Sequence, residues 1–171
     1  RMTMERPPYR VAVSAAAAVF GGYLLTLAPS VPFWDAGELI TAARTLGIPH
    51  PPGPPLFVLI AHVWGLLFAV GEYAWRLNLL SAVCGAAAAG CWFLVAHATA
   101  STMYREIGEE PRRALALGVG CAAALLTAFS FTNWQNSVET EVYSVAMLSI
   151  GLVAWLAIRW RAHRGRAVSY T

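Results

Sequence analysis

Long apolar runs alternate with short polar segments along this chain. Five of the runs stand out: Val11–Ala28, Pro55–Val70, Leu77–Ala98, Ala114–Phe131 and Val142–Trp160. A helix that crosses a bilayer needs about 20 apolar residues, and all but Pro55–Val70 are near that length. The pattern therefore predicts an all-α membrane protein, a single transmembrane domain over residues 1–171.

The distribution of Arg decides how many of the runs cross. Cytoplasmic segments of membrane proteins carry an excess of Arg and Lys. If all five runs crossed, the 105–113 loop and the Arg-rich tail would lie opposite the N-terminus. If Pro55–Val70 lies on the membrane surface, four spans remain, at 11–28, 77–98, 114–131 and 142–160. Ten of the twelve Arg then fall on the cytoplasmic side, and only Arg44 and Arg76 face outward. We therefore expect both termini to be cytoplasmic.

The outer loop 29–76 has structure of its own. Apolar residues recur at helical spacing in Asp35–Leu46, with Asp35 suited to the N-cap and Gly47 to the helix end. Five prolines in Ile48–Pro55 predict a rigid extended turn. Pro55–Val70 is then expected to form a second helix at the membrane surface.

Composition supports a membrane protein and excludes other classes. The chain is 58% hydrophobic and 12% charged, whereas soluble domains are about a quarter charged. The net charge of +3 does not indicate nucleic-acid binding, because the Arg residues cluster at segment ends. Cys84, Cys91 and Cys121 lie inside apolar runs without CxxC spacing, so packing is favoured over metal or redox chemistry.

Asp35 and Glu38 are candidate catalytic carboxylates. They lie three residues apart at the start of a predicted helix, so they share one face. A carboxylate beside the hydrocarbon boundary is costly unless it is used or paired, and such a group suits general-base work. The alternative is an N-cap Asp with a favourable helix dipole. Spacing alone does not separate the two interpretations.

Two basic side chains of the outer loop are candidate donor-binding residues. His50 lies in the Pro-rich turn and is either a hydrogen-bond donor to an anionic head group or an exposed turn residue. Arg76 faces outward against the charge trend, which suits a lipid phosphate. Alternatively, Arg76 is an interface residue that pairs with Glu72.

Glu139 and Glu141 add acidic residues to the second outer loop. Together with Asp35 and Glu38 they would form a cluster that supports the site or holds a divalent cation through oxygen ligands. A solvated loop is the alternative. No other cofactor is indicated, and the identity of any metal stays open.

Four segments taken in order resemble a known family: FWDAGELI, IPHPPGPPLFVLIA, WRLNLLSAV and NSVETEVYSVAML. They are similar to the N-terminal part of GT-C membrane glycosyltransferases, closest to the bacterial and eukaryotic family that contains a vertebrate protein O-mannosyltransferase. The resemblance implies surface-lying helices in the first loop and an outward-facing site. It carries Asp35 and Glu38 to the catalytic carboxylates, and His50 to the turn near the donor.

The resemblance also implies a reaction and its partners. The donor would be a polyprenyl-phosphate sugar, with mannose as one candidate, and the acceptor a hydroxyl of a protein or glycan. The expected setting is a bacterial inner membrane with the active face periplasmic or extracellular. GT-C enzymes are generally much longer, so we expect the N-terminal part of an enzyme, or a short paralogue completed by a partner chain.

Two other functions compete with transfer. A non-catalytic membrane module would bind a lipid-linked sugar or scaffold a complex. A transport bundle would use the acidic cluster as an ion site, but ion pathways place such residues within spans rather than in loops.

Overall fold

The computed structural model describes residues 6–51, 53–108 and 112–167. Helices make up all of the regular secondary structure in these ranges. In chain order they are α1 (Tyr9–Thr26), α2 (Asp35–Thr45), α3 (Pro55–Leu67), α4 (Tyr73–Glu106), α5 (Arg113–Phe129), α6 (Phe131–Val138) and α7 (Val142–Ala167). The predicted all-α membrane fold is confirmed.

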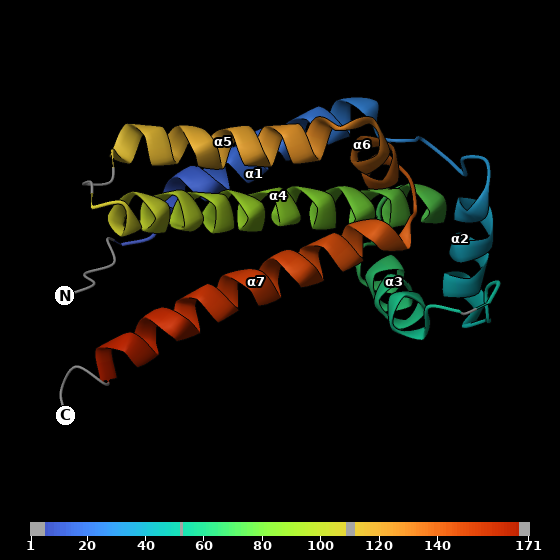
Figure 1. The fold of residues 1–171 in the computed structure, drawn as a ribbon. Helices are drawn as coiled ribbons and strands as arrows, with labels where there is room; N and C mark the ends of the chain where they lie inside the picture. The colour runs from blue at the N-terminus through green and yellow to red at the C-terminus, as the bar shows by residue number, and fades with distance from the viewer. Residues whose placement is uncertain (1–5, 52, 109–111, 168–171) are drawn as a thin grey trace.

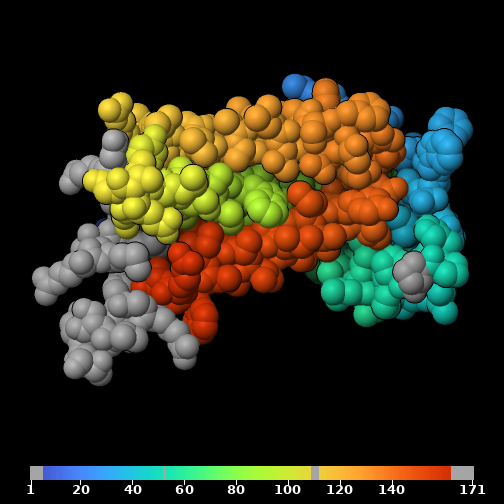
Figure 2. Space-filling model, in the orientation of Figure 1, coloured from blue at the N-terminus to red at the C-terminus, as the bar shows by residue number. Residues whose placement is uncertain are grey.

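The helices form a bundle with a helical cover at one end. The long helix α4 lies at the centre and packs against α1, α5 and α7 (Figure 1). The start of α1, the end of α4, the start of α5 and the end of α7 lie at one end of the bundle. The short helices α2, α3 and α6 lie at the opposite end, where α2 and α3 project beyond the bundle (Figure 2).

Three helices, α1, α4 and α7, are long and apolar enough to cross a membrane on their own. The remaining predicted span, 114–131, corresponds to α5. Helix α5 meets the same requirement of length and hydropathy only together with α6, and the two are bent by 66°. The break lies at Ser130, whose backbone leaves the helical region with φ −62° and ψ 141°. Its hydroxyl donates to the Thr127 carbonyl over 3.0 Å. The predicted run thus continues past the point where the helix stops.

Helix α3 is the apolar segment that the charge pattern assigns to the membrane surface. Its 13 residues extend about 20 Å at about 1.5 Å per residue, less than the hydrocarbon core of about 30 Å. One face packs on α2 and α4 through Phe57, Val58 and Ala61, which are buried. Leu59 and Leu66 are exposed, which suits a helix that lies in a membrane interface.

The bundle core is built from small side chains. Ala82, Ala86 and Ala89 of α4 pack in one buried cluster with Val19 and Tyr23 of α1 and with Ala124 of α5. Small residues allow helix backbones to approach closely in lipid, where no hydrophobic force drives helices together. The three cysteines, Cys84, Cys91 and Cys121, are free thiols within the packed helices.

A second cluster places α2 on the end of the bundle. Leu39, Ile40 and Ala43 of α2 are buried against α3 and the first turns of α4. This confirms the predicted apolar face of α2, apart from Leu46, which is exposed. Leu46 has φ 54° and ψ 36° and ends the helix in the left-handed region one residue before the predicted Gly47.

Candidate active site

The first turn of α2 presents two carboxylates at the end of the bundle opposite the start of α1 and the end of α7. Trp34, with φ 70°, precedes the helix, and Asp35 is its first residue. No side chain caps the helix start, so the predicted N-cap hydrogen bond of Asp35 is absent. Within the described ranges, the exposed Asp35 carboxylate forms no ion pair or side-chain hydrogen bond. It therefore points to solvent rather than serving the helix end.

Glu38, one turn further on, is fully engaged by His50. The His50 backbone N–H donates to Glu38 Oε1 over 2.6 Å, and its ring Nδ1 lies 2.8 Å from Glu38 Oε2. The Pro-rich turn makes this approach possible, because the Gly53 N–H bonds back to the His50 carbonyl over 2.9 Å and Gly53 has φ 64°. The structure thus brings together two residues that the sequence placed in separate roles.

The pairing sets the protonation of both groups. The hydrogen bonds from the His50 ring and backbone lower the pKa of Glu38. The same contact raises the pKa of His50, with smaller contributions from the charges of Asp35 and Glu141. A carboxylate accepts hydrogen bonds only, so Nδ1 carries a proton and Nε2 is left for a ligand. Both side chains are about half exposed, at 48% for His50 and 46% for Glu38.

Glu141 lies within electrostatic reach of the same group. Partial burial raises the pKa of its carboxyl, and the charges of Glu139 and Asp35 raise it further. The backbone N–H of Glu141 donates to Ser81 Oγ over 3.2 Å, which fixes the start of α7 on α4. The charge of Asp35 therefore acts on both His50 and Glu141, while the predicted acidic cluster of Asp35, Glu38, Glu139 and Glu141 stays a prediction.

A cation site is a separate question from this charge cluster. Among the residues that the structure describes, no group of three or more His, Cys, Asp and Glu side chains is arranged to hold a metal ion. The divalent cation therefore stays a prediction, and no described ligand set supports it.

Arg76 lies in the first turn of α4 and donates to backbone carbonyls of α3 and of the loop between α3 and α4. Its Nη1 bonds to Gly65 over 3.1 Å, its Nη2 to Gly71 over 2.7 Å, and its Nε to Val70 over 3.1 Å. These hydrogen bonds satisfy carbonyls in the last turn of α3 and in the loop that follows it. The predicted pairing of Arg76 with Glu72 is not among the ion pairs of the described residues. Its role in donor binding stays a prediction.

A buried polar node of Asn78 and Thr140 lies near the site and was not predicted from the sequence. Asn78 and Thr140 are both 0% exposed. Asn78 Nδ2 donates to the carbonyls of Ala28 and Ser30 over 2.9 and 3.0 Å, and Thr140 Oγ1 donates to Asn78 Oδ1 over 2.6 Å. The only signal in the sequence was a carboxamide inside an apolar run, in the segment WRLN.

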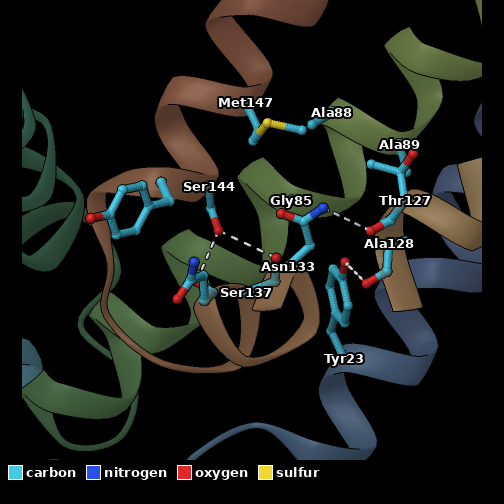
Figure 3. A pocket seen from close by; sticks show the side chains of 12 residues that line it. Tyr23, Gly85, Ala88, Ala89, Thr127, Ala128, Asn133, Ser137, Ser144 and Met147 are labelled. Carbon is cyan, nitrogen blue, oxygen red and sulfur yellow. Dashed lines mark hydrogen bonds between the residues drawn. The ribbon is translucent and has the colours of Figure 1, made fainter. Parts of the chain in front are cut away.

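A small pocket lies between α1, α4, α5, α6 and α7, and its lining mixes apolar side chains with hydroxyls and amides (Figure 3). Its volume of about 20 Å³ is room for about one water molecule. Tyr23 donates to the Ala128 carbonyl over 2.8 Å, and Ser144 donates to the Asn136 carbonyl over 2.9 Å. This pocket is too small for a sugar. The exposed surface beside Asp35 and His50 is the candidate site because the predicted carboxylates and the His50 ring meet there.

Comparisons with known proteins identify related sequences. A family model described as the protein O-mannosyl-transferase TMEM260 N-terminal domain matches residues 35–170. Protein O-mannosyl-transferase TMEM260 of Mus musculus is 40% identical over 151 residues, which are 88% of this chain and 20% of the mouse protein. Protein O-mannosyl-transferase tmem260 of Dictyostelium discoideum is 27% identical over 138 residues, 80% of this chain and 15% of that protein. No solved structure matches the chain.

Proposed function

Because the chain belongs to the protein O-mannosyl-transferase TMEM260 N-terminal domain family, we propose that it carries the catalytic carboxylate of a membrane glycosyltransferase. The reaction moves a sugar, by its relatives' names mannose, from a polyprenyl-phosphate donor to a hydroxyl of a protein acceptor. The chain spans 20% of the mouse relative, and the activity is proposed for the full-length protein. The exposed Asp35 beside the Glu38–His50 pair is the observation that carries the proposal.

The proposed active face is the one away from the cytoplasm. Four arginines lie toward the end of the bundle where α1 begins and α7 ends: Arg10 on α1, Arg105 on α4, Arg113 on α5 and Arg159 on α7. The positive-inside tendency makes this end cytoplasmic. Asp35, at the other end, then faces the lumen, the periplasm or the cell exterior. The two relatives named above are eukaryotic, so the predicted bacterial inner membrane has no support from them.

The proposed chemistry is a direct displacement at the sugar. As the acceptor oxygen bonds to the anomeric carbon, the Asp35 carboxylate takes the hydroxyl proton. The bond between the anomeric carbon and the phosphate oxygen breaks, and its electron pair leaves with the lipid phosphate. A positioned base of this type raises the reaction rate about 10²–10⁴-fold. Asp35 lies at the end of the bundle, where a donor held in the membrane and an acceptor in the aqueous phase can meet.

We propose that His50 binds the donor phosphate and that Glu38 orients the His50 ring. Because Nδ1 is held by Glu38 over 2.8 Å, Nε2 is oriented as the free donor of the ring. The raised pKa of His50 favours the cationic ring, and a charge-assisted hydrogen bond to phosphate is stronger than a neutral one. Glu38 therefore orients His50 instead of acting as a second base, and Glu141 adds negative charge on the acceptor side.

The experiment is Asp35→Asn in the full-length protein. Asn keeps the shape of the side chain but cannot take a proton, and loss of the charge at the helix start costs about 0.3–1 kcal/mol. We expect transfer of mannose from labelled polyprenyl-phosphate mannose to protein to fall at least about 10²-fold. Thermal stability in detergent should stay near that of the wild type.

The matched control is Glu72→Gln, which removes the charge of an exposed carboxylate at the same end of the bundle but keeps an oxygen that can accept the 3.5 Å hydrogen bond from the Ser30 hydroxyl. This variant should transfer sugar at the wild-type rate. Wild-type transfer by Asp35→Asn would reject Asp35 as the base. Donor binding without any transfer by the wild-type protein would favour a non-catalytic sugar-lipid module.

A further inference from the structure

We propose that Asn78 is a positioning residue, whose buried amide ties the loop carrying Asp35 to the turn carrying Glu141 and so sets the distance between them. The inference rests on the function proposed above and extends it to a residue that does not touch substrate. Asn78 lies on α4, in the second turn of the central helix.

The amide of Asn78 joins three segments that are distant in sequence. Its two N–H groups reach Ala28 and Ser30, 50 and 48 residues earlier, in the loop that leads into Asp35. Its carbonyl oxygen accepts from Thr140, 62 residues later, which lies between Glu139 and Glu141. Both donors and one acceptor position of the amide are therefore used.

Two neighbouring bonds tie the same segments. The Ala28 N–H donates to the Val138 carbonyl over 2.9 Å, which joins the end of α1 directly to the end of α6. Ser81, on the same face of α4 one turn after Asn78, accepts the Glu141 N–H over 3.2 Å. Two polar side chains of α4 thus hold both loops against a single rigid helix.

Physical chemistry explains why an amide is needed at this position. Ala28 and Ser30 lie between helices, so their carbonyls have no helical partner and are free to accept from Asn78. The side chain of Asn78 is 0% exposed, and its buried N–H groups would be costly without these partners. An apolar side chain of similar size would fill the space but would not fix the loops in one arrangement. A fully bonded polar network specifies a single geometry. Separate loops carry Asp35 and Glu141, so a single geometry of these loops is required to keep the two carboxylates at a fixed distance.

The test uses Thr140→Val in the full-length protein, with Thr140→Ser as its conservative partner. Val keeps the shape of Thr and removes only the hydroxyl that donates to Asn78. We expect Thr140→Val to lower kcat about tenfold, because misplaced catalytic groups lose rate steeply, while KM for polyprenyl-phosphate mannose stays within about twofold. Thr140→Ser should restore kcat, and Asn78→Asp, which lacks both N–H donors, should lower it further.

Thr102→Val is the matched control. The Thr102 hydroxyl bonds only within α4, to the Ala98 carbonyl over 2.9 Å, so its loss should leave kcat unchanged. Wild-type kcat in folded Thr140→Val, even with a lower Tm, would mean that the node is only structural and would overturn the inference. Wild-type transfer by Asp35→Asn would instead overturn the proposed function, and the inference with it. An inactive Asp35→Asn with an unaffected Thr140→Val overturns the inference alone.

Discussion

The bundle and its outer end are held together by different forces. In the bundle, Phe93 and Ala124 are buried among apolar neighbours, and the hydroxyls of Thr102 and Ser149 bond within their own helices. At the outer end, polar side chains bond to other elements. The pairs are His62 with the Ala43 carbonyl, Trp64 with the Arg76 carbonyl, Trp134 with Thr26, and Asn78 with both loops.

The difference shows where stability and geometry reside. Close packing of small residues holds helices together in lipid, but it leaves the connecting loops free to adopt several arrangements. Directional hydrogen bonds at the outer end select one of them. Substitutions in the bundle should therefore act mainly on stability, and substitutions at the outer end mainly on catalysis.

The largest effect on stability is expected for Phe93→Ala. Phe93 is 0% exposed, and its ring lies against Gly120 of α5, where an added Cβ would lie 2.9 Å from the ring. Removal of a buried Phe side chain costs about 3–5 kcal/mol. Thermal unfolding in detergent should show a large fall in Tm, while kcat of the remaining folded protein stays near that of the wild type.

The control for this prediction is Leu126→Ala on the neighbouring helix α5. Leu126 is 74% exposed, so its truncation removes little packing and should change stability by no more than about 0.5 kcal/mol. Equal losses for Phe93→Ala and Leu126→Ala would contradict the view that stability resides in the bundle core.

A smaller effect is expected for Arg76→Lys. Lys keeps the charge but cannot reproduce the three directions in which the guanidinium donates to Gly65, Val70 and Gly71. We expect a loss of about 1–2 kcal/mol in the free energy of unfolding, measured by thermal unfolding in detergent. The same variant tests the predicted role in donor binding: if Arg76 contacts the donor phosphate, the affinity for polyprenyl-phosphate mannose at equal folded fractions should fall about tenfold, and an unchanged affinity would remove Arg76 from the donor site.

The sequence predicted what local pattern and charge determine. Helices at the four segments predicted to cross, a separate short helix at Pro55–Leu67 and the buried face of α2 follow from the spacing of apolar residues. The position of Pro55–Val70 on the membrane surface stays a prediction from the Arg distribution. The break at Ser130 escaped prediction because apolar residues continue through Phe131, so hydrophobicity carries no signal of the bend.

The site was predicted only as a set of separate residues. The pairing of Glu38 with His50 depends on a Pro-rich turn that folds back onto α2, and spacing along the chain does not reveal such a return. The Asn78 node depends on partners 48 to 62 residues away. Long-range hydrogen bonds leave no periodic pattern, so a single sequence shows the polar residue but not its partners.

The Glu38–His50 pair has a pH window that follows from its two pKa shifts. The pKa of Glu38 lies below its ordinary value of 4.5, so the stability from its charged form is present above 4.5 and is lost as pH falls through the lowered value. The pKa of His50 lies above its ordinary value of 6.5, so the stability from its charged form is complete below 6.5 and is lost as pH rises through the raised value. The pair is therefore intact from mildly acidic pH to a limit above 6.5.

The smallest effect on stability, and a specific one on catalysis, is expected for Glu38→Gln. The neutral amide no longer favours the cationic ring, so the pKa of His50 should fall toward its ordinary value of 6.5. If His50 binds the donor phosphate as a cation, the upper limb of the profile of kcat/KM against pH for the donor should move to lower pH. Both partners are about half exposed, so the Tm should hardly change. An NMR titration of the His ring, assigned with His50→Gln, would give the same shift directly. An unchanged pH profile combined with a lowered His50 pKa would separate the pair from donor binding and leave it as a brace for the Pro-rich turn.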